Sequence, residues 1–499
     1  MTQLVVLPVL LPLLGAGLCL VLGRSARAQR IVSVAVLTAV VATASVLLYR
    51  ADTQGPQALT VAGWGPEIGI TLVADRLSAL MLLVSSVVTL AVLLYSFGQG
   101  IVEYGRDTPL SVFHPTYLVL SAGVSNAFLS ADLFNLFVGF EVLLAASYVL
   151  ITLGGTEARI RAGTVYIVVS LLSSIIFLIA IACIYAAVGT VNFAQLSQRL
   201  GDLDPAVAHL LQLLLLTVFC IKAAVFPLSA WLPDSYPTAP APVTAVFAGL
   251  LTKVGVYAIV RTQTLLFPDD SLRPLLLTMA ILTMVVGILG AVAQTDIKRI
   301  LSFTLVSHIG YMLLGVALGS ELALSGAVYY IAHHITVQTA LFLLAGLVEY
   351  RTGTTNLDRL GGLARSAPIL AVAFFVPAMN LAGIPPFSGF LGKVALAFWQ
   401  PVDDDLAQSV VDDGSDVWSH GALHGGGDVS TRTQQTSSWA RVAEEQRLPL
   451  GMGLPTLGLV VASVALTVFA GPLFRVTDAA ADELLQRTPY VQAVLGGDR

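Results

Sequence analysis

Runs of roughly 20 apolar residues recur along almost the whole chain and are separated by short polar segments. A helix of about 20 residues crosses a hydrocarbon core about 30 Å thick. The pattern therefore predicts about 13 transmembrane helices, near residues 4–23, 31–49, 77–97, 113–130, 133–153, 164–188, 208–230, 241–261, 274–293, 299–319, 323–348, 368–399 and 450–471.

Composition supports an all-α polytopic membrane protein. Hydrophobic residues make up 56% of the chain, charged residues 11%, and the mean hydropathy is +0.86, which excludes a water-soluble globule. The formal net charge is −5, and no basic surface indicates a nucleic-acid partner. Cys19, Cys183 and Cys220 lie in apolar helices without metal-ligand spacing, so they are interpreted as core residues and no metal site is expected.

Arginine and lysine in alternate loops set the expected orientation, because positive residues stay on the cytoplasmic side. The richer set of loops includes the first, with Arg24, Arg27 and Arg30, and the fifth, with Arg159 and Arg161. The opposite set holds fewer, chiefly Arg50, Arg76, Arg199, Arg261 and Arg273. The N-terminus is therefore expected outside.

Charges inside the apolar segments are the first functional signal. Only four lysines occur, and Lys222, Lys253 and Lys393 all lie within long apolar runs. Insertion scales put the cost of a lysine at a bilayer centre at about 2.5 kcal/mol or more, so these residues do not serve solubility. Glu141, in the fifth helix, is interpreted as a titrating carboxylate paired with a lysine on a neighbouring helix. The alternative is a static ion pair that holds helices together.

Two of these lysines lie beside predicted helix breaks. Lys222 precedes Pro227, where the seventh helix is expected to be interrupted, whereas Pro385 and Pro386 precede Lys393 in the twelfth. Broken backbone at membrane depth survives only beside protein or water, and therefore marks an ion path. The alternative is an ordinary proline kink. A lysine before one break and after the other suggests two inverted repeats.

Three histidines lie in the helices between these breaks. His308 falls in the tenth helix, and His333 and His334 fall in the eleventh. Histidine titrates near neutrality, so the row predicts a proton relay; for any single histidine the alternative is a hydrogen-bonded interhelical contact. Because His333 and His334 are adjacent, they point in different directions and at most one is expected to face the path.

Four motifs carry a family resemblance: FEVLLAASY at 140–148, IKAAVFPL at 221–228 with WLPD at 231–234, LTK at 251–253, and GIPPFSGFLGK at 383–393. Together they resemble the antiporter-type subunits shared by respiratory complex I and Mrp-type multisubunit cation/proton antiporters, over most of residues 110–398. The C-terminal residues 482–496 are similar to the tail of the Mrp D subunit, which favours the antiporter over complex I.

The resemblance implies roles for individual residues. Glu141 and Lys222 would be the interacting pair, Lys253 the central lysine and Lys393 the terminal lysine of the second half-channel, with His308 or His333 between them. It also implies two inverted five-helix bundles, about 14 helices, no cofactor and no catalytic residue.

The chain departs from the family pattern at two places. Some relatives have a lysine near Gln338, so the relay there would rely on His333, His334 and water. About one helix after Lys393 is also missing, because residues 402–448 are too polar to supply a span. The second repeat is therefore expected to be incomplete. Either the C-terminus lies on the cytoplasmic side or 368–399 does not cross fully.

The expected organisation has five parts: N-terminal helices at 1–110, a first antiporter-like bundle at 111–265, a second at 266–400, a polar disordered loop at 401–449, and a C-terminal helix with an amphipathic tail at 450–499. The function predicted is proton translocation in exchange for Na⁺ or another monovalent cation. The chain would be a multi-pass subunit in a prokaryotic plasma membrane, working with other membrane subunits and without covalent chemistry. Two alternatives remain: a proton-pumping subunit of an NADH:quinone oxidoreductase-type complex, and a structural subunit with a defective second half-channel.

Overall fold

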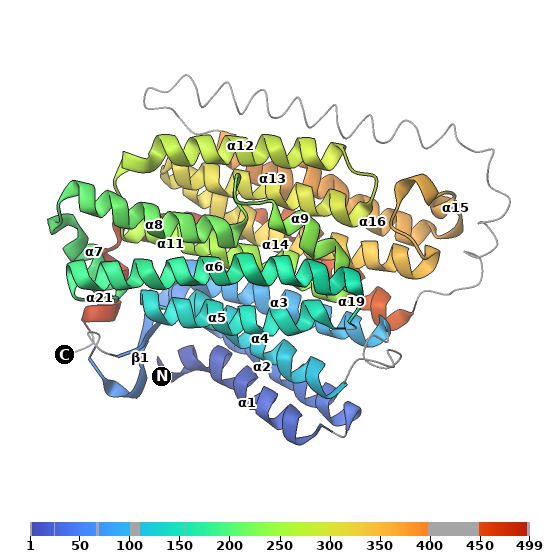
Figure 1. Cartoon of the computed structure of the whole chain (residues 1–499), viewed down its shortest axis with the longest axis horizontal. Coiled ribbons are helices and arrows are strands. Elements are labelled where there is room, and N and C mark those ends of the chain that lie inside the picture. Colours follow the sequence, from blue (N-terminus) through green and yellow to red (C-terminus); the bar gives the residue numbers. More distant parts are fainter. Residues whose placement is uncertain are drawn as a thin grey trace.

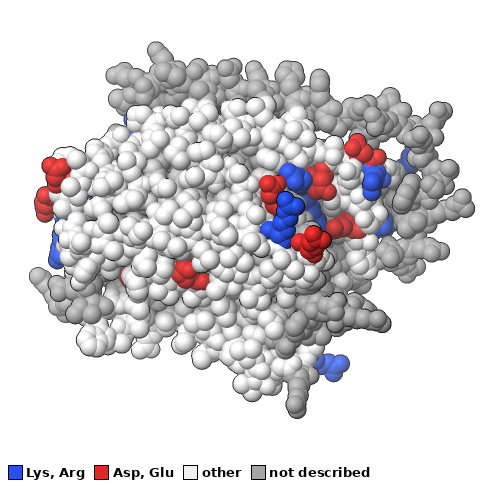
Figure 2. All heavy atoms as spheres, viewed as in Figure 1, with Lys and Arg blue, Asp and Glu red and all other residues white. Residues whose placement is uncertain are grey.

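The chain folds into a bundle of long helices that run along its longest axis (Figure 1). The computed structural model describes residues 2–23, 25–65, 69–99, 110–153, 155–397 and 449–496. Within these residues, 11 helices are long and apolar enough to cross a membrane. Figure 2 shows a face that is largely free of charge, with one cluster of Lys, Arg, Asp and Glu right of centre and a few further charges at the left edge. The all-α polytopic prediction is thus confirmed.

The N-terminal part contains three long helices and a small hairpin. Its elements are α1 (Leu7–Val21), α2 (Ala26–Gln54), β1 (Gln57–Thr60), β2 (Thr71–Ala74) and α3 (Arg76–Gln99). The two strands pair antiparallel, with Gln57 opposite Ala74 and Thr60 opposite Thr71. Strands of four residues leave no signal in a pattern of apolar runs of roughly 20 residues, so the sequence does not predict this hairpin.

The central part alternates long helices with short ones. It comprises α4 (Leu110–Leu129), α5 (Leu133–Thr152), α6 (Glu157–Val188), α7 (Phe193–Arg199), α8 (Pro205–Ala223), α9 (Trp231–Ser235), α10 (Ala241–Val246), a π-helix (Phe247–Leu251), α11 (Thr252–Leu265), α12 (Arg273–Val292), α13 (Ile297–Leu318), α14 (Glu321–Thr352), α15 (Leu363–Ser366), α16 (Pro368–Ala382) and α17 (Ser388–Ala397). The C-terminal part has α19 (Leu450–Val468), α20 (Ala470–Gln486) and α21 (Thr488–Leu495). The span Ala241–Leu265 and α14 are buried along their apolar lengths and form the centre of the bundle.

Two helix corners share one geometry, 164 positions apart in the chain. Asp132 caps the start of α5 and forms a β-bridge with Asn192, and Asp296 caps the start of α13 and forms the same bridge with Asn356. Both asparagines cap the helical turn that follows them. Figure 1 shows α7, which follows Asn192, and α15, which follows Asn356, at opposite ends of the bundle. Two inverted repeats would place matching corners at opposite ends in this way.

Two close contacts between a glycine and a neighbouring helix recur with the same separation along the chain as the two corners. A Cβ at Gly123 would lie 2.5 Å from the backbone nitrogen of Leu143, and a Cβ at Gly287 would lie 2.4 Å from that of Ser307. Each contact needs the bare backbone of glycine, because nothing larger fits where α4 meets α5 and α12 meets α13. The packing therefore supports the repeat independently of the corner bridges.

Both expected helix breaks are present. α8 ends at Ala223, the next residue, Ala224, has a φ of 60°, and helix resumes only at Trp231, so Pro227 lies in the interruption. α16 ends just before Gly383, which has a φ of 83°, and α17 starts at Ser388, so Pro385 and Pro386 lie in the second interruption. Gly383 suits this position because glycine adopts a positive φ without steric cost.

The end of α17 and the start of α19, which flank the expected missing helix, lie at opposite ends of the bundle. Ala395 packs at Gly326 near the start of α14, whereas Gly451 packs at Gly98, near the end of α3. Tyr95 of α3 donates to the carbonyl of Leu343 near the end of α14, so these two contacts lie about 30 Å apart along the bundle. The described chain thus stops at one end and resumes at the other. Figure 1 places both termini at the same end, and the expected polar loop at 401–449 lies almost wholly outside the described residues.

Candidate functional site

Glu141 and Lys222 are brought together through a serine. The hydroxyl of Ser174, on α6, donates to Oε1 of Glu141 on α5, and Lys222 Nζ on α8 donates to the Ser174 hydroxyl at 3.3 Å. Lys222 is 8% exposed and its Nζ lies 4.7 Å from the centre of the Phe140 ring. Three neighbouring helices thus contribute to one chain of hydrogen bonds that runs from the carboxylate to the ammonium group. The contact with the Phe140 ring adds a cation–π attraction.

The break after α8 opens space beside this chain. Lys222 lines a pocket with Tyr166, Trp231 and Leu251. The indole nitrogen of Trp231 donates to the carbonyl of Ile221 at 3.1 Å, so it bonds a backbone group next to the break. Leu251 ends the π-helix and is followed two residues later by Lys253. The pocket therefore lies between the first lysine and the segment that holds the second.

Lys253 is fully buried at the start of α11. Its Nζ donates to the carbonyl of Ala248 at 2.7 Å and to the Thr252 hydroxyl at 3.3 Å. Ala248 lies in the π-helix, a turn type that is frequent at functional sites. Both partners are neutral, so Lys253 has hydrogen bonds without a compensating carboxylate among them.

His308, Tyr330 and His334 form the next cluster, between α13 and α14. A ring nitrogen of His308 bonds the Tyr330 hydroxyl, and the two rings stack with centroids 5.7 Å apart. The ring of His334 lies 5.0 Å from that of His308. Within the described residues, neither ring nitrogen of His334 has a hydrogen-bond partner, although the side chain is fully buried. Buried polar groups normally find partners, so water is the expected partner of this ring.

His333 points to the second helix break. Its Nδ1 lies 2.9 Å from the hydroxyl of Ser388, which donates in turn to Oδ1 of Asn380 at 3.0 Å. The backbone nitrogen of Gly389 donates to the same Asn380 oxygen. His333 also lies 5.3 Å from Tyr330, between ring centroids, so both adjacent histidines contact the cluster.

Lys393 lies on α17 just past the second break. Its Nζ donates to the carbonyl of Ala382, the last residue of α16, at 2.9 Å. The same nitrogen lies 4.9 Å from the centre of the Tyr311 ring, and Tyr311 packs in turn against His308 and Tyr330. The lysine that follows the break is therefore adjacent to the histidine cluster.

Gln338 is buried on α14, one helical turn after His334. Its side-chain nitrogen donates to the carbonyl of Leu301 on α13 at 2.7 Å, and its Oε1 has no partner among the described residues. The amide thus ties two helices together and leaves one oxygen available to water.

Comparisons with known proteins give one consistent result. Residues 130–402 match the family model described as NADH:quinone oxidoreductase/Mrp antiporter, transmembrane. The chain is 39% identical over 505 residues to the D subunit of the Na⁺/H⁺ antiporter of Alkalihalophilus pseudofirmus, covering 99% of this chain and 100% of the relative. It is 40% identical over 400 residues to the D subunit of the Na⁺/H⁺ antiporter of Bacillus subtilis, covering 80% of each.

The chain belongs to the NADH:quinone oxidoreductase/Mrp antiporter family. Among solved structures, a chain of the Mrp complex of a Dietzia species matches with a TM-score of 0.89 and 34% identity, over 99% of this chain and 100% of that one. A chain of respiratory complex I from Thermus thermophilus matches with a TM-score of 0.78 and 26% identity, over 96% and 99%. The family resemblance inferred from the motifs is confirmed.

Several polar residues in this family member were missed in the sequence analysis. Ser174, Tyr330, Ser388 and Asn380 each link ionisable residues or helix ends, yet each lies in an apolar run and is uncharged. The adjacent pairs Ser173-Ser174 and Tyr329-Tyr330 are the only sequence signals for the first two.

Asp132 acts as the N-cap of α5. Its Oδ1 accepts from the backbone nitrogen of Asn135 at 2.6 Å. Burial raises the pKa of Asp132 to about 6. Hydrogen bonds from backbone nitrogens, including that of Asn135, partly oppose this shift. No group of three or more His, Cys, Asp and Glu residues within the described ranges is arranged to hold a metal ion.

Proposed function

We propose that this chain is the proton-translocating membrane subunit of a multisubunit monovalent cation/proton antiporter, in the plasma membrane of a prokaryote. Protons would move along Glu141, Lys222, Lys253, His308, His333 and Lys393, with His334 and Gln338 holding water beside the path. Na⁺ is the candidate cation, because a relative that matches nearly the whole chain is named as the D subunit of a Na⁺/H⁺ antiporter.

The observation that carries this proposal is the Glu141–Ser174–Lys222 chain beside a helix break and a pocket. A static ion pair needs neither a hydroxyl between its charges nor open space next to it. A hydroxyl that donates to a carboxylate and accepts from an ammonium can pass a proton between them. The half-buried carboxylate supports the charge of Lys222 in a low-dielectric setting, so moving the two apart weakens the hold of the lysine on its proton.

The second half of the path rests on the histidine cluster. In the proposed path His308 follows Lys253, and Tyr330 links His308 to His333. Lys393 contacts Tyr311 beside this cluster, and the ring of His334 lies next to that of His308. Lys253, His333 and Lys393 each form a hydrogen bond with a neutral carbonyl or hydroxyl group, which favours single-proton steps. We assign the first half-channel to residues 111–265 and the second to residues 266–400.

Two alternative functions can each be distinguished by a specific observation. The match to complex I from Thermus thermophilus supports a proton-pumping subunit of a quinone-reducing complex. Such a subunit would co-purify with flavin and iron–sulfur proteins. A structural role would follow if neutral replacements of Glu141 and Lys222 left transport intact.

The experiment that tests the proposal has two readouts. The chain is tagged and purified with its neighbours, and the same complex is assayed in inverted vesicles for dissipation of ΔpH on addition of Na⁺. Co-purification with membrane subunits alone, together with Na⁺-induced dissipation, is the expected result. Flavin and iron–sulfur subunits in the complex, with no response to Na⁺, would contradict it.

A further inference from the structure

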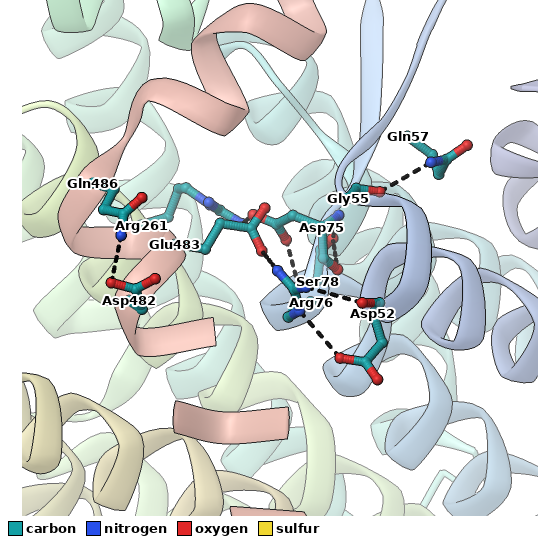
Figure 3. Close-up of polar contacts among 10 residues, drawn as sticks. All are labelled: Asp52, Gly55, Gln57, Asp75, Arg76, Ser78, Arg261, Asp482, Glu483 and Gln486. Carbon is teal, nitrogen blue, oxygen red and sulfur yellow. Dashed lines mark hydrogen bonds and ion pairs between the residues drawn. The ribbon is translucent and has the colours of Figure 1, made fainter. Parts of the chain in front are cut away.

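A buried charge cluster joins the C-terminal helix α20 to α3 and α11, outside the relay described above (Figure 3). Asp75 and Arg261 form an ion pair of 2.5 Å and are 2% and 3% exposed. Glu483 of α20 pairs with Arg76 at 3.1 Å, and Arg76 pairs also with Asp52 at 3.2 Å. Arg76 and Arg261, assigned to loops in the sequence analysis, are thus helical residues engaged in ion pairs.

The carboxylates in this cluster are unequally satisfied. Asp75 uses both oxygens: one accepts from the backbone nitrogen of Ser78 at 2.8 Å and the other binds Arg261. Asp52 is 45% exposed, so water can satisfy it. Glu483 is only 5% exposed, and its Oε1 has no partner within the described residues.

Glu483 also shares the cation to which it is bonded. The guanidinium of Arg76 donates through Nη1 to Glu483, and through Nε and Nη2 to the side chain and carbonyl of Asp52. The other guanidinium, Arg261, is held by Asp75 and lies over the rings of Tyr257 and Tyr490. Glu483 is thus a buried carboxylate with one unpartnered oxygen, and it shares the guanidinium of Arg76 with Asp52. Asp75 adds a second negative charge nearby. The ionised form of Glu483 is therefore poorly stabilised.

We propose that Glu483 is a proton-binding site at the end of the bundle that carries both termini, and that the negative charge it gains on releasing the proton weakens the seating of α20 against α3 and α11. This site needs neither the relay nor the cation that is exchanged. It makes the position of the C-terminal helix sensitive to the acidity of the water that reaches Asp52.

The direction of the effect follows from linkage. Burial and the charge of Asp75 raise the pKa of Glu483 to about 7, while Arg76 and Arg261 oppose the shift. The seated helix therefore binds a proton more tightly than an unseated one does. Seating is strongest below the ordinary glutamate range, weakens as the pH rises toward 7, and changes little above that.

The first measurement detects the proton directly. Infrared difference spectra of the purified complex are recorded between pH 5 and 9, and the carboxylic-acid C=O band is followed. We expect a band that titrates near pH 7 and is absent in Glu483→Gln. A band that titrates at an ordinary glutamate value, or one that survives in Glu483→Gln, would overturn the proposal.

The second measurement reports on the helix. A spin label is placed at the exposed position 485 in a Cys183→Ser background, since Cys183 is the exposed native cysteine among the three. Label mobility is expected to rise with pH in the wild type and to stay at its low-pH value in Glu483→Gln. Mobility that does not change with pH in the wild type, or that changes equally in Glu483→Gln, would refute the coupling.

Two further variants keep the test independent of folding defects. Asp482→Asn changes the exposed neighbour, which bonds Gln486 on its own helix, and should leave the band and the midpoint unchanged. Asp52→Asn frees Arg76 for Glu483, so the midpoint should move to lower pH by several tenths of a unit or more. A midpoint that stays in place or rises in Asp52→Asn would contradict the shared-cation argument.

Discussion

Replacing Ser174 by alanine tests the connection between Glu141 and Lys222. The hydroxyl donates to the carboxylate and accepts from the ammonium, so its loss removes two hydrogen bonds to charged groups. Such bonds contribute about 1.5–3 kcal/mol each. Glu141 is half-buried, so water can replace part of the lost hydrogen bonding. We therefore expect the barrier to proton transfer to rise by about 1.5 kcal/mol, the lower end of that range. That corresponds to a rate roughly 10-fold lower.

The assay is cation-induced ΔpH dissipation in inverted vesicles that contain the whole complex at matched expression. Ser173→Ala is the control, because the Ser173 hydroxyl bonds the carbonyl of Ser170 on its own helix at 2.7 Å. We expect Ser174→Ala to slow transport about 10-fold and Ser173→Ala to keep the wild-type rate. Equal rates in the two variants, with both complexes intact, would refute the reasoning.

Three further outcomes follow from the structure. Tyr330→Phe removes the hydroxyl that bonds His308 and should slow transport by roughly fivefold, for a loss of about 1 kcal/mol, measured in the same vesicles. Gly255→Ala places a Cβ 2.7 Å from the backbone nitrogen of Ala223, and the strain of about 1–3 kcal/mol should lower the melting temperature of the purified complex. An unchanged melting temperature would show that α8 and α11 can separate freely. Asp132→Asn retains a good N-cap residue and should leave transport at the wild-type rate; a large loss would mean that the carboxylate acts in transport.

The helical architecture was predictable because the bilayer imposes it. Apolar runs mark the spans, and prolines mark both interruptions, at Pro227 and at Pro385-Pro386. The observed helices extend beyond the predicted runs, as α6 and α14 do, because hydropathy detects only the apolar part of a helix. The β1–β2 hairpin was missed because four-residue strands leave no signal of that kind.

The site was predictable to the extent that charge in an apolar run is conspicuous. Lys222, Lys253 and Lys393 were all identified in this way, and the structure places each beside a break, a π-helix or the histidine cluster. The residues that connect them were not identified. Ser174 and Tyr330 are neutral and common in membrane helices, and only the packing of α6 on α8 and of α13 on α14 shows what they contact.

The charge cluster at Glu483 could not be predicted for a different reason. Its members lie on or next to α2, α3, α11 and α20, which meet only in the folded chain. Arg76 and Arg261 fall at the edges of apolar runs, where a charge is normally solvated. Tertiary packing buries Arg261 and partly buries Arg76 instead, and it brings both against their carboxylate partners.

The most direct test of the central claim compares wild type with Lys222→Ala in cation-induced ΔpH dissipation, using inverted vesicles with the neighbouring subunits present and expression matched. The account predicts that the variant assembles normally and that its transport is abolished, because the first half-channel then lacks the group that exchanges a proton with Glu141 through Ser174. Transport at the wild-type rate in an assembled Lys222→Ala complex would contradict the proposed relay.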